Sequence, residues 1–230
     1  MLICGLQKMS MVDYPGKLAA TVFTGGCNLR CPFCHNAGLV THLGDSSRLE
    51  QEEVLRFLKS RRGLLDAVVL SGGEPLLQPG AVELLAAFRE TGLLVKLDTN
   101  GCYPQVLKEI LNRGLVDYVA MDIKNCPEKY PMTVGVPGFD LSPVEESIRA
   151  LKESGVDFEL RTTVSRELHT PEDIAAIGQW LGGTERYYLQ NFEDSGDVIA
   201  PGLHGFTEEE MEAFVSAARP WAKHVEIRGF

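Results

Sequence analysis

Long apolar runs and basic clusters are both missing from this sequence of 230 residues. No stretch approaches the roughly 18 uninterrupted apolar residues that a membrane-spanning helix needs. Lysine and arginine total 22 against 32 aspartates and glutamates, which gives a net charge of −10, and the longest basic run is Lys59–Arg62. A protein that binds a phosphate backbone normally presents a basic face. We therefore expect neither a membrane nor a nucleic acid as a partner.

The sequence also lacks a serine- or glycine-rich linker and a low-complexity segment, so we expect a single domain over residues 1–230. Its first residues, Met1–Lys8, contain no apolar core of signal-peptide length. This predicts a cytoplasmic location, in which thiols stay reduced. The apolar fraction of 44% and the charged fraction of 23% are average for a globular protein, and they exclude disorder and collagen.

Short apolar runs alternate with segments of helical periodicity along the chain. Capping-box patterns at Ser142, Thr170 and Thr207 mark three helix starts. This alternation predicts an α/β fold, and about six units indicate a partial (β/α)6 barrel of the triosephosphate-isomerase type with parallel strands. Site residues then belong at the carboxyl ends of the strands. The predicted strands are Ala19–Thr24, Ala67–Leu70, Leu93–Leu97, Val116–Met121, Phe158–Val164, Arg186–Leu189 and Val225–Ile227.

Three of the six cysteines follow the first predicted strand within eight residues. Cys27, Cys31 and Cys34 have the spacing C-x3-C-x2-C. Three thiolates on one loop can hold three irons of a 4Fe–4S cluster and leave the fourth iron open to a ligand. The alternative is a structural zinc site completed by His35, although adjacent side chains such as Cys34 and His35 rarely converge on one ion. The other three cysteines are predicted to be buried thiols: Cys4, Cys102 and Cys126.

Polar residues follow the next three predicted strands. Gly72, Gly73 and Glu74 form a turn whose main chain could meet a ligand ammonium, although such turns are common. Asp98 and Thr99 precede an Asn-Gly turn, in which Asp98 could be an ordinary local cap.

One acid and one base are predicted to share a strand face. The two-residue period of a strand puts Asp122 and Lys124 on one side, an arrangement that suits a zwitterionic ligand. Arg161, in the fifth predicted strand, could form a solvated ion pair with Glu159 on the same face. The histidines His42, His169, His204 and His224 show no partner pattern and are predicted to be surface or capping residues.

The cysteine segment resembles that of the radical S-adenosylmethionine (radical SAM) enzymes, with Phe33 in the aromatic position of their C-x3-C-x-aromatic-C signature. Together with the run Val12–Gly16, which reads Val-Asp-Tyr-Pro-Gly, it looks like the activating enzymes of glycyl-radical enzymes. The chain is most similar to proteins that activate anaerobic ribonucleoside-triphosphate reductase.

This resemblance implies a 4Fe–4S cluster on the three cysteines and S-adenosylmethionine (SAM) as cofactor. It implies that main-chain atoms of Gly72, Gly73 and Glu74 bind the SAM amino group. It also implies SAM contacts, and a nearby monovalent cation, for a second set of residues: Asp98, Thr99, Asp122 and Lys124, with Arg161 close to SAM. Some relatives place a histidine near the end of the sixth strand, where Gln190 or Asn191 stands here.

The implied reaction is reductive cleavage of SAM to a 5′-deoxyadenosyl radical, which abstracts a hydrogen atom from a backbone glycine of a glycyl-radical enzyme. A reduced flavodoxin or ferredoxin would supply the electron, and no side chain need act as a general base. Two alternatives stay open. One is a radical SAM enzyme acting on a small molecule or peptide, and the other is a non-catalytic zinc or electron-carrier module.

Overall fold

The computed structural model describes residues 1–41, 43, 48–194 and 196–229. The chain divides into two compact units. The first unit comprises Met1–Asn28, Gly38–Ala120 and Pro143–Asp157, and the second comprises Leu29–Ala37, Met121–Ser142 and Phe158–Phe230. The single domain expected over residues 1–230 stays a prediction.

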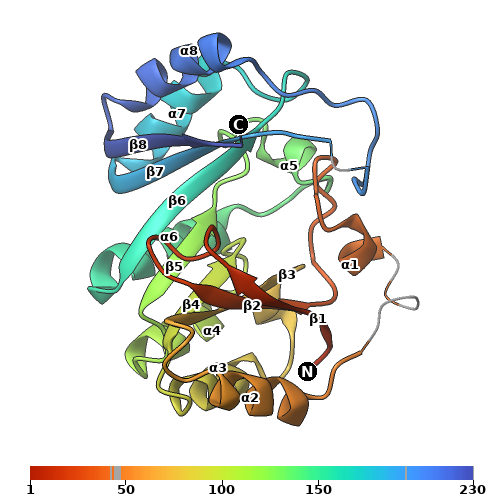
Figure 1. Cartoon of the computed structure of the whole chain (residues 1–230). Helices are drawn as coiled ribbons and strands as arrows, with labels where there is room; N and C mark the ends of the chain where they lie inside the picture. Colours follow the sequence, from red (N-terminus) through yellow and green to blue (C-terminus); the bar gives the residue numbers. More distant parts are fainter. Residues whose placement is uncertain (42, 44–47, 195, 230) are drawn as a thin grey trace. The chain divides into compact units, whose positions relative to one another are not determined.

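Helices and strands alternate along most of the chain (Figure 1). The strands are β1 (Ile3–Ser10), β2 (Ala19–Thr24), β3 (Ala67–Gly72), β4 (Leu94–Thr99), β5 (Tyr118–Asp122), β6 (Asp157–Val164), β7 (Thr184–Asn191) and β8 (Ala222–Arg228). The helices are α1 (Ala37–Thr41), α2 (Gln51–Ser60), α3 (Ala81–Arg89), α4 (Pro104–Asn112), α5 (Tyr130–Thr133), α6 (Ser142–Ser154), α7 (Pro171–Leu181) and α8 (Glu208–Ala218), with a 3-10 turn η1 at Pro75–Leu77. Hydrogen-bonded neighbours in the sheet follow the chain order from β1 to β8.

In the first unit, β2, β3 and β4 pair in parallel, with Ala19 opposite Ala67 and Thr24 opposite Gly72. The first four residues of both β2 and β3 are buried, as expected for parallel strands covered on both faces. Helices α2 and α3 contact each other, and so do α3 and α4 (Figure 1). All seven predicted strands are present, with bounds shifted by up to three residues.

One strand of the first unit was not predicted. β1 pairs antiparallel with β2, and its register shifts twice along the pair. Those irregularities break the two-residue alternation that marks a strand in a sequence. The Val-Asp-Tyr-Pro-Gly run lies between these two strands. Its Tyr14 is buried against Ala19, Ala67 and Tyr118, with 5.6 Å between the two tyrosine ring centroids. This tyrosine therefore belongs to the apolar core of the first unit.

In the second unit, β6, β7 and β8 pair in parallel, and α7 and α8 contact each other. Buried Tyr187 stacks edge-on against Trp221, with 4.5 Å between ring centroids, and its hydroxyl lies 2.5 Å from Thr162 Oγ1. The capping boxes predicted at Thr170 and Thr207 are confirmed. α6 begins at Ser142, one residue before the predicted first helical position, and the Ser142 hydroxyl donates to Asp140 Oδ1 at 2.7 Å, so the capping box at Ser142 stays a prediction.

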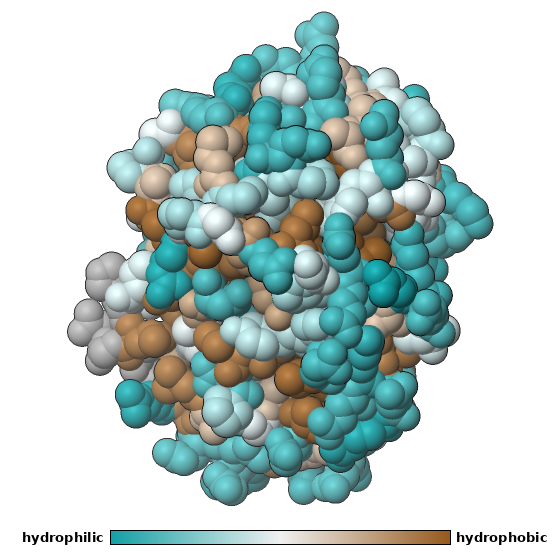
Figure 2. Space-filling view, turned by 180° about the vertical axis from the view of Figure 1, so that it is seen from behind, coloured by the Kyte–Doolittle hydropathy of each residue, from teal (hydrophilic) through white to brown (hydrophobic). Residues whose placement is uncertain are grey.

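The surface is mostly polar. On the face in Figure 2, hydrophobic residues lie among a majority of hydrophilic ones. Within the described part of the chain, no helix is both long enough and apolar enough to cross a membrane. The large hydrophobic side chains that are exposed are Met9, Met11, Val12, Leu64, Leu77 and Met132.

Candidate functional site

The predicted site residues are divided between the two units. The first unit holds Cys27, Gly72, Gly73, Glu74, Asp98 and Thr99. The second holds Cys31, Phe33, Cys34, Asp122, Lys124 and Arg161. All six cysteines are free of disulfides. Among the described residues, no three histidine, cysteine or acidic side chains lie close enough together to hold a metal ion, so the cluster ligands stay a prediction.

The end of β3 packs against the loop that carries Cys27. The Gly73 amide donates to Thr24 O at 2.9 Å, and the Glu74 amide donates to Gly26 O at 2.8 Å. A side chain on Gly73 would overlap Gly26 O, and one on Gly72, whose φ is +122°, would overlap the Thr24 backbone. Glycine is therefore required at both positions by close backbone approach. The amides of Gly73 and Glu74 thus hold β3 to the end of β2 and to the cysteine loop. A ligand ammonium would be met by carbonyl oxygens of this turn, since an ammonium only donates hydrogen bonds.

Glu74 is fully buried, and its carboxylate binds neighbouring groups of the chain. Oε1 accepts from Thr99 Oγ1 at 2.8 Å and from the Leu76 amide at 3.0 Å, while Oε2 accepts from the Asn100 amide at 2.6 Å. A buried carboxylate is tolerated when several donors satisfy it. Glu74 thus ties the 3-10 turn after β3 to the end of β4.

Asn100 is a site neighbour that sequence reasoning did not select. Its Nδ2 donates to Asn28 Oδ1 at 2.9 Å and lies 3.8 Å from Cys27 Sγ. Its Oδ1 accepts from the Cys102 amide at 3.0 Å. The signal available in the sequence was its position directly after a strand, beside Asp98 and Thr99. Asn100, directly after β4, thus orients the loop of Cys27, which follows β2.

Asp98 is held by an ion pair with a buried lysine. Lys96 Nζ lies 2.6 Å from Asp98 Oδ1, and Ser71 Oγ donates to Asp98 Oδ2 at 3.0 Å. The Lys96 side chain is only 2% exposed. In the turn that follows β4, Asn100 Oδ1 accepts from the Cys102 amide. Sequence reasoning missed Lys96, whose signal was a charged residue two positions before Asp98 inside an apolar strand.

In the second unit, Asp122 lies between two cations. Lys124 Nζ is 2.8 Å from Asp122 Oδ2, and Arg161 Nε binds Asp122 Oδ1. Burial disfavours the charge on Asp122, yet Arg161 and Lys124 hold the pKa of this carboxyl well below its usual range. Burial likewise disfavours the Lys124 ammonium, but Asp122 raises the pKa of Lys124 above its usual range. The shared face predicted for Asp122 and Lys124 is confirmed.

Arg161 and Glu159, which the sequence offered as a possible ion pair, each bind a partner from another strand or strand end. Arg228 takes that carboxylate, with Nη1 2.8 Å from Oε1 and Nη2 3.0 Å from Oε2 of Glu159. The guanidinium carbon of Arg228 also lies 3.5 Å from the ring centroid of Tyr188. Arg161 binds Asp122, which lies 39 residues before it in the sequence but next to it in space.

Phe33 packs against Lys124 and His169. It is 3% exposed, Lys124 Nζ lies 5.8 Å from its ring centroid, and His169 approaches it edge-on at 6.1 Å between centroids. His169 Nε2 lies 2.8 Å from Lys124 O, and Nδ1 accepts from the Ser165 amide at 3.3 Å. Burial lowers the pKa of His169, so its neutral form is favoured.

The prediction that His169 is a surface or capping residue is therefore wrong, since it is 2% exposed. His204 and His224 are exposed as predicted, each 69% by side chain. His42 lies outside the described residues. The local sequence does not mark His169 as buried, because Phe33 and Lys124, which pack against it, come from segments far away along the chain.

Cys31 and Cys34 lie on a turn that the second unit fixes in place. The Cys34 amide donates to Cys31 O at 3.1 Å, and the Ala200 amide donates to Pro32 O at 3.0 Å. Burial raises the pKa of the Cys34 thiol. His35 packs its ring against Phe192, 5.3 Å between centroids, and its buried Nε2 has no hydrogen-bond partner within the described residues.

The remaining predictions concern thiols and an amide. Cys4 and Cys126 are buried as predicted, whereas Cys102 is only half-buried. The side chain of Asn191 is engaged with the Phe206 backbone, to which Nδ2 donates at 2.9 Å and from which Oδ1 accepts at 2.8 Å. Of the two residues offered in place of a histidine, Asn191 is therefore already committed.

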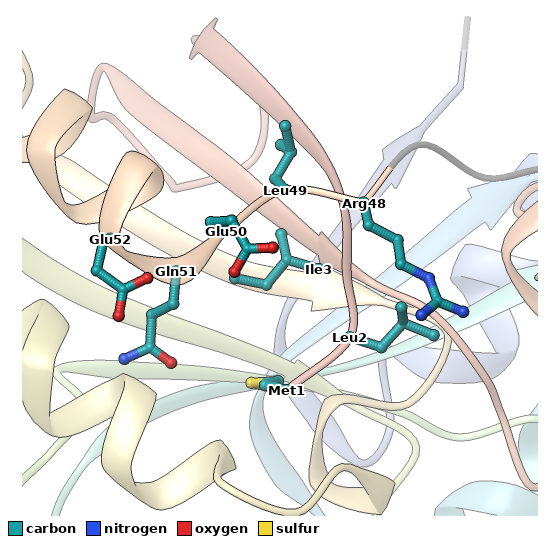
Figure 3. Close-up of a pocket in the computed structure, with 8 residues that line it drawn as sticks. All are labelled: Met1, Leu2, Ile3, Arg48, Leu49, Glu50, Gln51 and Glu52. Carbon is teal, nitrogen blue, oxygen red and sulfur yellow. The ribbon is translucent and has the colours of Figure 1, made fainter.

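A cavity of about 460 Å³ lies elsewhere in the first unit (Figure 3). It is formed by the N-terminal segment and the start of α2, and no predicted site residue lines it. The lining residues are Met1, Leu2, Ile3, Arg48, Leu49, Glu50, Gln51 and Glu52.

The sequence of this chain is similar to those of known proteins. The sequence matches the model of the Radical SAM superfamily over residues 21–218. It is 34% identical, over 99% of this chain and 95% of the other, to a Methanocaldococcus jannaschii protein whose name assigns it provisionally to the glycyl-radical enzyme activating enzymes. It is 32% identical to the pyruvate formate-lyase-activating enzyme of Clostridium pasteurianum, over 70% of this chain and 68% of that protein.

Solved structures share the fold at low sequence identity. A radical SAM methyltransferase from Sphaerobacter thermophilus has a TM-score of 0.70 and 16% identity, covering 94% of this chain and 68% of that one. Streptococcus suis SuiB bound to its precursor peptide SuiA has a TM-score of 0.68 and 16% identity, covering 89% of this chain. The match takes in about half of SuiB, 47% of its chain. The predicted α/β fold of the partial-barrel type with parallel strands is confirmed.

Proposed function

Since the chain belongs to the radical SAM superfamily and, within it, to the glycyl-radical enzyme activating enzymes, we propose that its protein substrate is an anaerobic ribonucleoside-triphosphate reductase. A relative that is 34% identical over 99% of the chain carries the glycyl-radical enzyme as the class of substrate. The Asp-Tyr-Pro-Gly sequence within Val12–Gly16 supports the choice of reductase. Similarity to pyruvate formate-lyase-activating enzymes makes that lyase the competing target.

Cys27, Cys31 and Cys34 would hold the 4Fe–4S cluster. The donor chemistry suits such a cluster, because none of the three thiols is in a disulfide and thiolates are the ligands that hold iron–sulfur clusters. When bound, the cluster and SAM supply reductive cleavage to a 5′-deoxyadenosyl radical, with the electron coming from a reduced flavodoxin or ferredoxin. The protein's own contribution is to bind, orient and shield these groups.

The charges at the strand ends suit a zwitterionic ligand. In the second unit, Lys124 and Arg161 together carry one positive charge more than Asp122 balances, so this group attracts a ligand carboxylate. Both cations are partly accessible, at 15% and 19% by side chain. We assign the SAM carboxylate to this group and the SAM amino group to main-chain atoms of Gly72, Gly73 and Glu74.

The other predicted residues position these groups. Glu74 fixes Thr99 and the start of the loop after β4, and Phe33 covers Lys124 with its ring. Hydrogen abstraction from a glycine needs no proton transfer by a side chain, so we assign no general base. The apolar ring of Phe33 helps to exclude water from the charged group.

A second candidate function is modification of a small molecule or a peptide. It is favoured by the likeness to SuiB, whose structure was solved with a precursor peptide. Such an enzyme would cleave SAM productively without a large protein partner, whereas an activating enzyme would depend on one.

The proposal is tested by electron paramagnetic resonance on the anaerobically reconstituted protein with SAM, a reductant and an anaerobic ribonucleoside-triphosphate reductase. We expect a stable organic doublet, split by one α-hydrogen, on the reductase. The matched control is Cys31→Ala, which removes one proposed cluster ligand and should abolish the doublet.

Two outcomes would contradict the proposal. A doublet that forms only on pyruvate formate-lyase would move the substrate to that enzyme. If the anaerobic protein contained zinc but neither iron nor sulfide, the protein would be a structural metal module and not an enzyme.

A further inference from the structure

We propose that Lys96 supplies, from within the chain, the positive charge that a bound monovalent cation would otherwise place on Asp98. Binding of SAM would then be independent of sodium or potassium. The inference rests on the proposed function only in taking SAM as the ligand. It replaces the cation that the family resemblance implies by a lysine ammonium fixed to β4.

The first support is the burial of Lys96. Its side chain is 2% exposed, and its neighbours on β4, Val95 and Leu97, are fully buried. A lysine ammonium is costly to remove from water unless it is paired. Its partner here is Asp98, with Nζ 2.6 Å from Oδ1. The pleat of β4 puts residues 96 and 98 on the same face, so the ammonium reaches towards the carboxyl end of the strand.

The second support is that Asp98 is satisfied on both oxygens. Oδ1 binds Lys96, and Oδ2 accepts from Ser71 Oγ at 3.0 Å. An alkali cation binding Asp98 would have to displace the ammonium or lie beside a like charge in a poorly hydrated place.

The other oxygen ligands that the resemblance implies are also engaged. Thr99 Oγ1 donates to Glu74 at 2.8 Å and accepts from the Gly101 amide at 3.1 Å. In the second unit, Asp122 binds both Lys124 and Arg161. Each implied cation ligand is therefore already satisfied by groups of its own unit.

The position of the ion pair favours a role beyond stability. A buried ion pair can often be replaced by apolar residues of similar volume without loss of stability. Here the pair lies at the carboxyl end of a parallel strand, where ligands bind in folds of this class. Lys96 is thus a positioning residue, which orients the Asp98 carboxylate and balances its charge.

The experiment compares cation dependence in the wild-type protein and in Lys96→Met. Affinity for SAM is measured on the reconstituted protein at constant ionic strength, in tetramethylammonium, sodium or potassium chloride. The melting temperature of the cluster-free protein is measured in the same salts, as a readout that needs neither cluster nor turnover. The control is Lys108→Met, which removes a surface lysine 2.5 Å from Glu146.

We expect wild-type and Lys108→Met proteins to give the same SAM affinity, within twofold, in all three salts. Lys96→Met should bind SAM at least tenfold more weakly in tetramethylammonium chloride, and potassium or sodium should restore binding with saturation. Its melting temperature should rise with the same cations. The double variant Lys96→Met/Asp98→Asn, which has no carboxylate to balance, should be insensitive to them.

Two results would overturn the inference. One is a wild-type protein whose SAM affinity requires potassium or sodium. The other is a Lys96→Met protein that is indifferent to these cations. Should Lys96→Met unfold without alkali cations, refolding on addition of potassium chloride supports the inference, and failure to refold overturns it. The reductase takes no part, so these outcomes are separate from those of the activation test.

Discussion

Two ion pairs of this protein join residues that lie two positions apart along the chain. Lys96 with Asp98 on β4, and Asp122 with Lys124 at the end of β5, follow directly from the strand pleat. The surroundings of Asp122 set its charge state, because burial opposes its ionisation while Arg161 and Lys124 favour it more strongly.

Replacing Asp122 by asparagine should weaken SAM binding more than it destabilises the fold. Lys124 and Arg161 would then face each other without a carboxylate between them, and SAM would be misplaced. We expect a loss of about tenfold in SAM affinity, or about 1.4 kcal/mol, measured by equilibrium dialysis with the reconstituted protein. Because the pKa of Asp122 is lowered, the wild-type pair is ionised throughout the pH range from about 5 to 8. SAM affinity should therefore not change with Asp122 ionisation there.

The matched control is Asp140→Asn, which changes an exposed aspartate bound to Ser142. It should leave SAM affinity as in the wild type. An Asp122→Asn protein with unchanged SAM affinity would remove Asp122 from the site.

At the scale of elements, the helix starts follow their sequence signals closely. In α8, Thr207 accepts from the Glu210 amide and Glu210 accepts from the Thr207 amide, which completes the capping box. Arg166 adds a two-pronged ion pair to Glu210 from the segment after β6. The hydrogen bond that Arg166 donates to Glu210 is the main cause that lowers the pKa of Glu210 to about 2.

Thr207→Ala should destabilise the protein by about 1 kcal/mol, the usual cost of losing a helix N-cap. For a chain of this size this lowers the melting temperature by about 2–4 °C, measured by circular dichroism. Ser216→Ala, on an exposed position of the same helix, is the control and should cause no loss. Equal melting temperatures for Thr207→Ala and wild type would show that the box contributes nothing.

The pH dependence of this cap has a definite sign. The folded-state pKa of Glu210 lies below its unfolded value of about 4.3, so its contribution is complete above that value. It is lost as the pH falls towards about 2.

At the scale of the whole molecule, the chain folds as two compact units that share the cysteine segment between them. Cys27 belongs to the first unit, and Cys31 and Cys34 to the second. Each unit has its own buried apolar side chains, and no disulfide contributes to either. The packing within each unit therefore involves no disulfide cross-link.

We accordingly expect iron-free protein and Cys31→Ala to give the far-ultraviolet circular dichroism of a folded α/β protein. Cluster binding should raise the melting temperature of the wild type alone, since a ligand that binds only the folded state stabilises it. Loss of the dichroism signal in Cys31→Ala would contradict this view. Retained iron in that variant would instead refute the assignment of Cys31 as a ligand.

The sequence alone determined features that depend on neighbours within a few residues. The apolar runs predicted seven strands, the capping boxes predicted the starts of α7 and α8, and the cysteine spacing predicted the chemistry. Such patterns report local backbone geometry, which short-range sterics and hydrogen bonds control.

Only the tertiary structure decided which distant groups meet. It paired Arg161 with Asp122 and Arg228 with Glu159, and it buried His169 beside Phe33. It also turned Glu74 towards Thr99, 25 residues away along the chain. These contacts depend on strand register and on the packing of loops across the sheet, and neither leaves a periodic mark in the sequence.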